Sequence, residues 1–341
     1  MRYRSRVPRR AVLRGAGGAL PPLLAAGCGP PGSALLGSGR RDDGTGGGLR
    51  IMVPNAAGGG YDITARTVAR VLQETGITPD VQVFNLPGAG GTVGLQRVVN
   101  ERGNGGLLLQ MGLGVVGASH VARSRATVAS TTPIARLADE TGAVVVPRDS
   151  PHRTIGDLVA AWRADPARLT VGGGSSPGGP DHLLPMELAR AVGISPRRVD
   201  YVAYSGGGGD LLPALLDGDV DFAATGFGEF LDQVDAGQLR VLAVTGAGPV
   251  DALPGVPTLA ASGIDLVFSN WRGIVAPPGI DDADRRRWTD ALTALHASPP
   301  WRAALRRNGW SDAFAVGDTF RSFLVRQDAA VARLVADLGL N

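Results

Sequence analysis

Short apolar runs alternate with amphipathic stretches along most of the chain from Leu49 onward. Apolar runs of this kind are typical of buried strands, whereas apolar residues that recur every three or four positions indicate helices. Strands and helices that alternate in this way predict an α/β fold with parallel sheets. The predicted strands are Leu49–Val53, Val81–Phe84, Leu107–Met111, Ile134–Leu137, Ala143–Val146, Leu169–Val171, Val199–Ala203, Val220–Ala224 and Leu239–Val244.

Helices are predicted between these strands and again at the end of the chain. In the first helix, Ile63, Thr67 and Val71, together with Val68 and Leu72, form a largely apolar stripe that we expect to face inward. Residues 254–279 are rich in turns instead. The predicted helices are 62–75, 92–101, 154–164, 181–192, 208–217, 228–236, 281–297, 299–307 and 318–338.

The loop after the first strand has the composition of an anion-binding loop. It contains Ala57, Gly58, Gly59 and Gly60 directly before a helix. Consecutive glycines let the backbone turn freely, and the first turn of a helix offers unpaired N–H groups and the positive end of its dipole. Such a loop can hold an anion without a cationic side chain. Asp62 stands in the first turn, where it is either a helix cap or a ligand contact.

Three further loops repeat this arrangement. The second strand is followed by Gly88, Ala89, Gly90, Gly91 and Thr92. Loops at the carboxyl ends of neighbouring parallel strands lie at one edge of the sheet, so we expect the first two loops to share a ligand. In the second half of the chain, the corresponding loops carry Ser175 with Ser176, and Tyr204, Ser205 and Gly206.

Two enzyme motifs offer alternative functions. Gly112–Gly117 has the spacing of a dinucleotide fingerprint, as in an exported oxidoreductase, but it follows the third strand where the fingerprint normally follows the first. Ser176 lies in a Gly-x-Ser-x-Gly sequence, as in a serine hydrolase. Because Pro177 has no N–H to donate to an oxyanion, this second motif is weakened.

Composition excludes several other functions. The chain of 341 residues contains no lysine, so a Schiff-base lysine and a P-loop lysine are impossible. The four histidines are scattered and predict no metal site, and we expect no cofactor. The net charge of +3 comes from the first 27 residues, which hold six arginines and no acid, so it gives no case for nucleic-acid binding.

The N-terminal region predicts export and anchoring. Residues 1–27 have the layout of a secretory signal, within which Arg9 and Arg10 resemble a twin-arginine signal. Cys28, the only cysteine, follows small residues as in a bacterial lipobox and is therefore predicted to carry a lipid anchor. Residues 28–48 are rich in Gly, Ser and Pro, as expected of a flexible tether.

The glycine loops resemble those of the extracytoplasmic solute-binding proteins of tripartite tricarboxylate transporters, the Bug-type receptors. The resemblance rests on the motifs at 57–62 and 87–94, on Ser175–Leu183 and Val202–Leu212, and on Trp271-x-Gly273. It implies a two-lobed periplasmic-binding-protein-like (type II) fold, in which each lobe is a mostly parallel sheet flanked by helices. Lobe 1 would comprise 49–141 plus 248–341, and lobe 2 would comprise 142–247.

The same resemblance implies a function. The protein would be a non-enzymatic receptor that closes its two lobes around a small carboxylate, such as a di- or tricarboxylate. We expect a monomer at the outer face of the cytoplasmic membrane, with membrane transporter subunits as partners.

Overall fold

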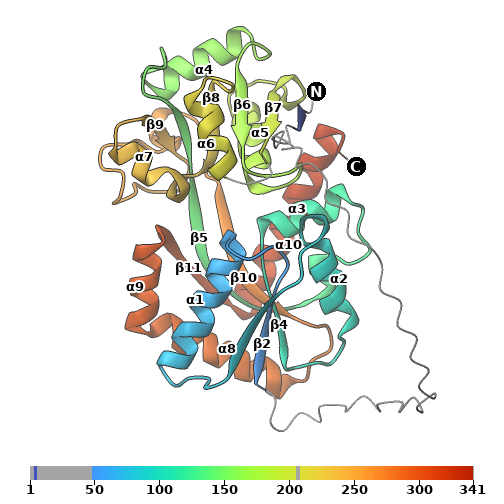
Figure 1. Cartoon of the computed structure of the whole chain (residues 1–341). Helices are drawn as coiled ribbons and strands as arrows, with labels where there is room; N and C mark the ends of the chain where they lie inside the picture. Colours follow the sequence, from blue (N-terminus) through green and yellow to red (C-terminus); the bar gives the residue numbers. More distant parts are fainter. Residues whose placement is uncertain (1–3, 6–47, 205–207, 341) are drawn as a thin grey trace, which may run out of the picture.

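The computed structural model describes residues 4–5, 48–204 and 208–340. They form the predicted two-lobed α/β fold, which Figure 1 shows with one lobe above the other. Apart from Arg4 and Ser5, the predicted export signal lies outside the described residues, as do Cys28, most of the tether, and the loop residues Ser205 and Gly206. Among the helices within the described ranges, none combines the length and the apolar character needed to cross a bilayer.

The lower lobe is built on three parallel strands and three antiparallel ones. The parallel group is β3–β2–β4, and β10 pairs antiparallel with both β4 and β5. The strand β4 is buried along its whole length because helices cover both faces of the sheet. The strands of this lobe are β2 (Leu49–Val53), β3 (Val81–Asn85), β4 (Leu107–Gly112), β5 (Thr132–Pro147), β10 (Ser269–Ala276) and β11 (Trp310–Val316).

The upper lobe contains a second group of parallel strands. The strands β7, β6 and β8 run parallel, and β5 pairs antiparallel with β8 and β9. Its strands are β1 (Arg4–Ser5), β6 (Thr170–Gly173), β7 (Asp200–Ala203), β8 (Phe222–Gly226) and β9 (Leu239–Val244), together with the end of β5.

The strand β5 joins the two lobes. It was predicted as two separate strands, but it runs for 16 residues without a break and pairs with β10 and β11 below and with β8 and β9 above. Figure 1 shows β5 passing from one lobe to the other, with β10 beside it. The antiparallel pairs lie at this crossing, and the parallel pairs lie further out in each lobe.

Local sequence signals explain where several helices begin. The hydroxyl of Thr154 accepts a hydrogen bond of 3.1 Å from the amide of Asp157, and the Asp157 carboxylate accepts one from the amide of Thr154. This is a capping box, which satisfies donors that the first helical turn leaves free. The helices are α1 (Gly60–Glu74), α2 (Thr92–Asn100), α3 (Leu113–Val121), α4 (Ile155–Ala164), α5 (Pro180–Ala191), α6 (Gly208–Leu216), α7 (Leu231–Asp235), α8 (Asp282–Ala297), α9 (Pro299–Arg307) and α10 (Gly317–Leu338).

The inward face of α1 differs from the prediction at one position. Val68 and Leu72 are fully buried, as expected, but Ile63 is 43% exposed. Tyr61 and Ala65 are buried in its place, because they lie on the same helix face as Val68 and Leu72, at spacings of three, four and seven residues. The buried stripe of α1 is therefore rotated around the helix axis relative to the predicted stripe. This rotation places Tyr61 at the edge of the sheet.

The helix α10 contacts both lobes. In the lower lobe, Asp328 pairs with His120 of α3 at 2.8 Å. Near the end of α10, the carbonyl of Asp337 accepts a hydrogen bond of 2.8 Å from Nε of Arg197, which belongs to the upper lobe. Figure 1 shows the end of this helix beside the upper lobe. The two lobes are thus connected by β5, by β10 and by the C-terminal helix.

Candidate functional site

The first two glycine loops lie side by side, as predicted. Asn85 joins them, because its side-chain amide donates 3.0 Å and 2.9 Å hydrogen bonds to the carbonyl of Asn55 and to Oδ1 of Asp62. A Cβ atom on Gly94 would stand only 2.9 Å from Cβ of Pro54, so the two backbones pack closely. This arrangement gathers the ends of β2 and β3 at the N-termini of α1 and α2, at one edge of the sheet.

The loop after β2 is exposed, but its amides are not all available to a ligand. Residues 55–60 are exposed, and Asp62, at 4% exposure, is buried beneath them. Oδ2 of Asp62 accepts a 2.9 Å hydrogen bond from the amide of Gly58. Asp62 therefore reaches back from the helix to hold its own loop, and it engages the amide of Gly58.

The carboxylate of Asp62 is strongly stabilised as an anion. Burial raises its pKa, but hydrogen bonds from Arg66, from the Gly58 amide and from Asn85 outweigh this effect. The resulting pKa is about 2, below the ordinary 3.8. Nε of Arg66 lies 2.9 Å from Oδ2. Because Asp62 is paired within the loop, its charge adds little repulsion toward a bound anion.

The loop after β3 adopts backbone conformations that favour glycine. Gly88, Gly90 and Gly91 have φ of 154°, 66° and 99°, and Ala89 is also left-handed at 46°. The hydroxyl of Thr92 donates to the carbonyl of Ala89 at 3.0 Å, which closes the turn. A left-handed alanine costs free energy, so the surrounding contacts must hold this loop in place.

The helix α3 lies between the loops of the two lobes. A Cβ on Gly90 would stand 2.6 Å from Cβ of Ala118, and a Cβ on Gly117 would stand 1.8 Å from the carbonyl oxygen of Gly178. The first contact belongs to the lower lobe, whereas Gly178 belongs to the loop that follows β6 in the upper lobe. Two of the four predicted glycine loops, those after β3 and β6, therefore meet at α3.

The glycines of the dinucleotide-like motif are accounted for by packing. A Cβ on Gly112 would meet the carbonyl oxygen of Trp271 at 2.2 Å, and a Cβ on Gly114 would meet the Tyr61 hydroxyl at 3.0 Å. The amide of Gly114 donates to that hydroxyl at 3.0 Å. This geometry does not favour the oxidoreductase alternative, because chain atoms occupy the space in which a pyrophosphate would approach these glycines.

In the upper lobe, Ser175 and Ser176 form part of the loop that meets α3. Ser176 is exposed, and the backbone carbonyl of Ser175 accepts a 2.8 Å hydrogen bond from the Tyr201 hydroxyl. The amide of Gly174 donates to Asp181 at 3.0 Å, which repeats the way in which Asp62 holds Gly58. Tyr204, the next predicted site residue, is buried, and its amide donates to the carbonyl of Gly173.

His182 holds the loop that contains Ser175, Ser176 and Gly178. It is fully buried, its Nδ1 accepts a 3.2 Å hydrogen bond from the amide of Gly178, and its ring packs edge-to-face on Tyr201 at 4.8 Å. Burial lowers its pKa to about 4, so the ring is neutral at pH 7. A buried imidazole that is already engaged with a loop amide does not favour the hydrolase alternative, which needs a base for Ser176.

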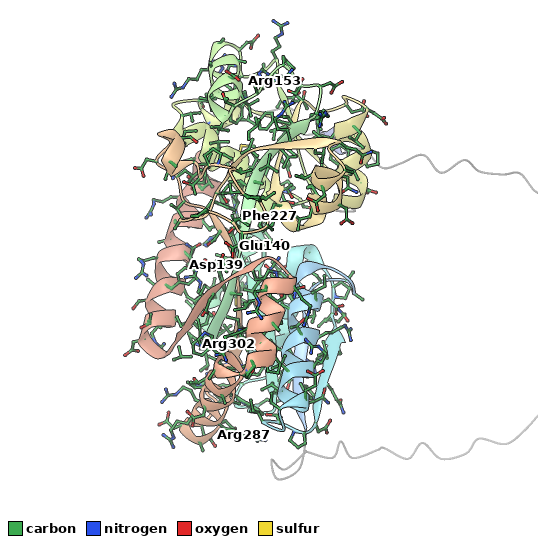
Figure 2. The ribbon with its side chains drawn as sticks, turned by 90° about the vertical axis from the view of Figure 1, so that its left-hand side faces the viewer. Asp139, Glu140, Arg153, Phe227, Arg287 and Arg302 are labelled. Carbon is green, nitrogen blue, oxygen red and sulfur yellow. The ribbon has the colours of Figure 1, made fainter. Side chains whose placement is uncertain are left out.

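Two charged residues that we did not predict lie beside these loops. Arg272 on β10 and Glu140 on β5 form an ion pair at 2.5 Å, and their side chains are 8% and 17% exposed. Nη2 of Arg272 would stand 2.5 Å from a Cβ on Gly60. In the sequence, Arg272 stands between Trp271 and Gly273. The pattern of hydrophobic positions does not mark it as a site residue. Figure 2 shows Glu140 near Phe227, where the chain passes between the lobes.

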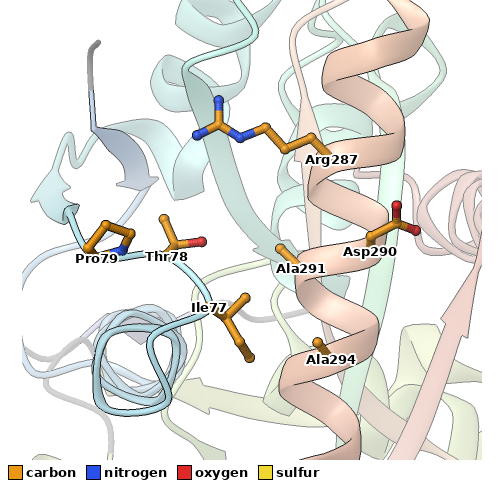
Figure 3. Close-up of a pocket in the computed structure, with 7 residues that line it drawn as sticks. All are labelled: Ile77, Thr78, Pro79, Arg287, Asp290, Ala291 and Ala294. Atoms are coloured by element: carbon orange, nitrogen blue, oxygen red, sulfur yellow. The ribbon is translucent and has the colours of Figure 1, made fainter.

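Two surface hollows lie elsewhere. One, of about 400 Å³, separates residues 77–79 from α8 at the C-terminal end of α1, opposite the glycine loops (Figure 3). The other, of about 640 Å³, is lined by residues of the upper lobe that include Arg148, Arg153 and Arg240. Neither hollow includes a predicted site residue, and no group of three metal-ligating side chains occurs within the described ranges.

Two lobes joined by shared strands, with their strand-to-helix loops facing each other, define the periplasmic-binding-protein-like class of fold. The family profile "Tripartite tricarboxylate transporter family receptor" matches residues 64–340, and the chain belongs to this family. The predicted family is thereby confirmed.

Individual relatives agree with this assignment. The chain is 28% identical over 295 residues to the UPF0065 protein in the gbd 5′ region of Cupriavidus necator, which covers 86% of this chain and 88% of the relative. It matches the crystal structure of a TctC solute binding protein from Polaromonas with a TM-score of 0.72 and 25% identity, over 85% of this chain and 98% of that one. The R. palustris protein Rpa4515 with adipate shares the fold, with a TM-score of 0.73 and 22% identity over 86% of this chain and 97% of that one.

Proposed function

We propose that the protein is an extracytoplasmic receptor that captures a small carboxylate between its lobes and delivers it to a tripartite tricarboxylate-type transporter. The observation that carries this proposal is the convergence of the glycine loops of β2 and β3, with Arg272 beside Gly60. Backbone amides at the start of α1 and α2, supported by a cation, suit a carboxylate. The related structure with adipate, a dicarboxylate, supports the same ligand class.

In this proposal, residues of both lobes contact the ligand. The lower lobe supplies Ala57–Gly60 and Gly88–Thr92, and the upper lobe supplies Ser175, Ser176 and the loop from Tyr204 to Gly206. Asp62 acts through the loop that it holds rather than through the ligand. Lobe 1 comprises 49–141 plus 248–341 and lobe 2 comprises 142–247, so closure changes the angle between them at β5 and β10. No metal or cofactor takes part.

The proposed setting is the outer face of the cytoplasmic membrane. Residues 1–27 act as the export signal, Cys28 carries the lipid, and residues 28–48 link the anchor to a monomeric folded part. The membrane subunits of the transporter are the proposed partners.

Isothermal titration calorimetry with a panel of carboxylates tests the function. The panel contains dicarboxylates, tricarboxylates, short aromatic acids and amino acids, and we expect at least one to bind with a Kd below about 100 μM. NAD and an acyl ester serve as probes of the two enzyme alternatives. Binding of NAD or turnover of the ester, with no carboxylate bound by the intact protein, would refute the receptor function.

A further inference from the structure

The ion pair between Arg272 and Glu140 occupies the crossing between the lobes. In the pairing of β10 with β5, Asn270 lies opposite Glu140 and Trp271 lies opposite Asp139. Oε2 of Glu140 accepts hydrogen bonds from Nη2 of Arg272 at 2.5 Å and from Nδ2 of Asn270 at 3.1 Å. The pair is thus fixed by the two strands that connect the lobes, and it does not belong to a mobile surface loop.

The pair touches a glycine loop of the lower lobe and the end of β8 in the upper lobe. On the lower side, the Arg272 guanidinium lies over the Tyr61 ring at 4.8 Å, and its Nη2 adjoins Gly60. On the upper side, Oε1 of Glu140 would stand 2.7 Å from a Cβ on Gly226. An anion held by the amides of Gly59 and Gly60 would therefore lie beside the Arg272 guanidinium and its partner Glu140, with the Asp62–Arg66 pair beneath the loop.

The pair also has unused hydrogen-bonding capacity. Arg272 is 6% exposed, and its Nε has no hydrogen-bond partner within the described part of the chain. A buried charge is costly unless it is paired and its donors are satisfied, and two apolar side chains would serve packing as well. A buried guanidinium with a spare donor beside a glycine loop is therefore better explained by a ligand than by stability alone.

We propose that Arg272 and Glu140 determine ligand selectivity: Arg272 binds a carboxylate of the ligand, and Glu140 accepts a hydrogen bond from a hydroxyl or ammonium group on the neighbouring carbon. Glu140 also repels a further negative charge at that position. The ligand class is then an α-hydroxy or α-amino carboxylic acid, as opposed to the same acid without that donor. This inference rests on the proposed function, since it assigns roles in the same carboxylate site.

Succinate, malate and aspartate test the selectivity, because they share four carbons and two carboxylates and differ in the substituent on the second carbon. We expect the parent protein to bind malate or aspartate more tightly than succinate. In Glu140→Gln, this preference should shrink by about tenfold or more, since the amide no longer attracts a cationic or donor group as strongly. In Arg272→Gln, affinity for all three acids should fall by at least about tenfold.

The matched control is Asp139→Asn. Asp139 is the neighbour of Glu140 on β5 and forms a comparable ion pair with Arg136 at 2.5 Å, but that guanidinium lies over Phe323 of α10. We expect this variant to keep the parent preference. The double variant Arg272→Gln/Glu140→Gln removes both buried charges, so it should remain folded and show weak, unselective binding. Thermal unfolding of each variant confirms that the fold is intact.

The outcomes separate the two proposals. If no carboxylate in the calorimetric panel binds the parent protein, the proposed function fails, and the selectivity proposal fails with it. If the parent protein binds carboxylates and the folded Glu140→Gln and Arg272→Gln variants keep its affinities and preference, the function stands and the selectivity proposal is refuted.

Discussion

The amide of Gly58 donates a 2.9 Å hydrogen bond to Oδ2 of Asp62, four residues further along the chain. The sequence left Asp62 as either a helix cap or a ligand contact. The N-cap of α1 is Gly59, and Asp62 acts from the third helical position, as the acid of a capping box does. It bonds one residue further back than in that motif, so it holds the loop against the helix. Asp62 thereby fixes the position of the glycine loop at the candidate site.

Asp62→Asn should destabilise the protein at neutral pH. The anion contributes stability above the unfolded pKa of 3.8, and this stability is lost as pH falls toward the folded pKa of about 2. The free energy of unfolding in urea should fall by on the order of 2 kcal/mol at pH 7, and the difference should largely disappear near pH 2. The control Glu74→Gln removes an exposed pair with Arg70 on the same helix and should change stability by less than about 0.5 kcal/mol.

Larger side chains at Gly59 and at Gly90 should affect stability differently. Gly59 has φ of −78°, and a Cβ there would lie 3.7 Å from the nearest oxygen, so Gly59→Val should fold normally and lose ligand affinity. Gly90 has φ of 66° and packs against Ala118, so Gly90→Ala should also lower the unfolding temperature. Differential scanning fluorimetry and calorimetry measure the two effects. Equal loss of stability in both variants would contradict this distinction.

Local patterns predicted the outer strands and the glycine loops well. The alternation of short apolar runs with helices located β2, β3 and β4, and it placed the loops 54–62 and 85–94 at a common edge. These features are local, because a strand end, a glycine loop and a helix start follow each other in sequence. Family resemblance supplied the two-lobed arrangement, which no local pattern contains.

The centre of the fold was harder to predict. The strand β10 lies within a segment that we described as rich in turns, and it pairs with both β4 and β5. Its apolar residues do not alternate, because the strand is buried on both faces from Trp271 to Ala276. Missing β10 meant missing Arg272. The contacts of Arg272 with Glu140 and Gly60 span 132 and 212 residues, so no local pattern reveals them.

Gly117→Ala should prevent the present contact between the lobes. The added Cβ would stand 1.8 Å from the carbonyl oxygen of Gly178, so α3 and the loop of the upper lobe must separate. We expect weaker ligand binding and a larger radius of gyration in solution scattering. Gly248→Ala is the control, since no atom lies within 4 Å of a Cβ there. An unchanged affinity in Gly117→Ala would show that this contact is not needed for the bound state.

Cys28→Ser should release the protein from membranes. In the proposed setting, the lipid on Cys28 is the anchor and residues 28–48 only connect it to the folded part. Fractionation of cells that produce the parent and the variant measures the change, and Ser33→Ala in the tether serves as the control. Membrane association that persists in Cys28→Ser would refute the anchor.

Mild acid should lower the free energy of unfolding, because the unfolded chain binds a proton at His182 more readily than the folded chain does. Burial lowers the pKa of the folded-state imidazole from 6.5 to about 4, so between these pH values the unfolded chain binds a proton that the folded chain does not. Stability is therefore full above pH 6.5 and should fall by about 3 kcal/mol as pH approaches 4. The hydrogen bond from the Gly178 amide to Nδ1 would be lost on protonation, which ties this loss to the loop that meets α3.

His182→Asn separates the charge of this residue from its packing. Asparagine keeps an acceptor near the position of Nδ1 but does not titrate, so the variant should be less stable at pH 7 and should lack the decline that His182 contributes between pH 6.5 and 4. Tyr201→Phe is the matched control, because it keeps the ring beside His182 and removes only the hydroxyl that donates to Ser175. Its stability should fall by a similar amount at every pH. Urea unfolding at half-unit intervals measures all three proteins, and a decline that persists unchanged in His182→Asn would assign the acid sensitivity to other groups.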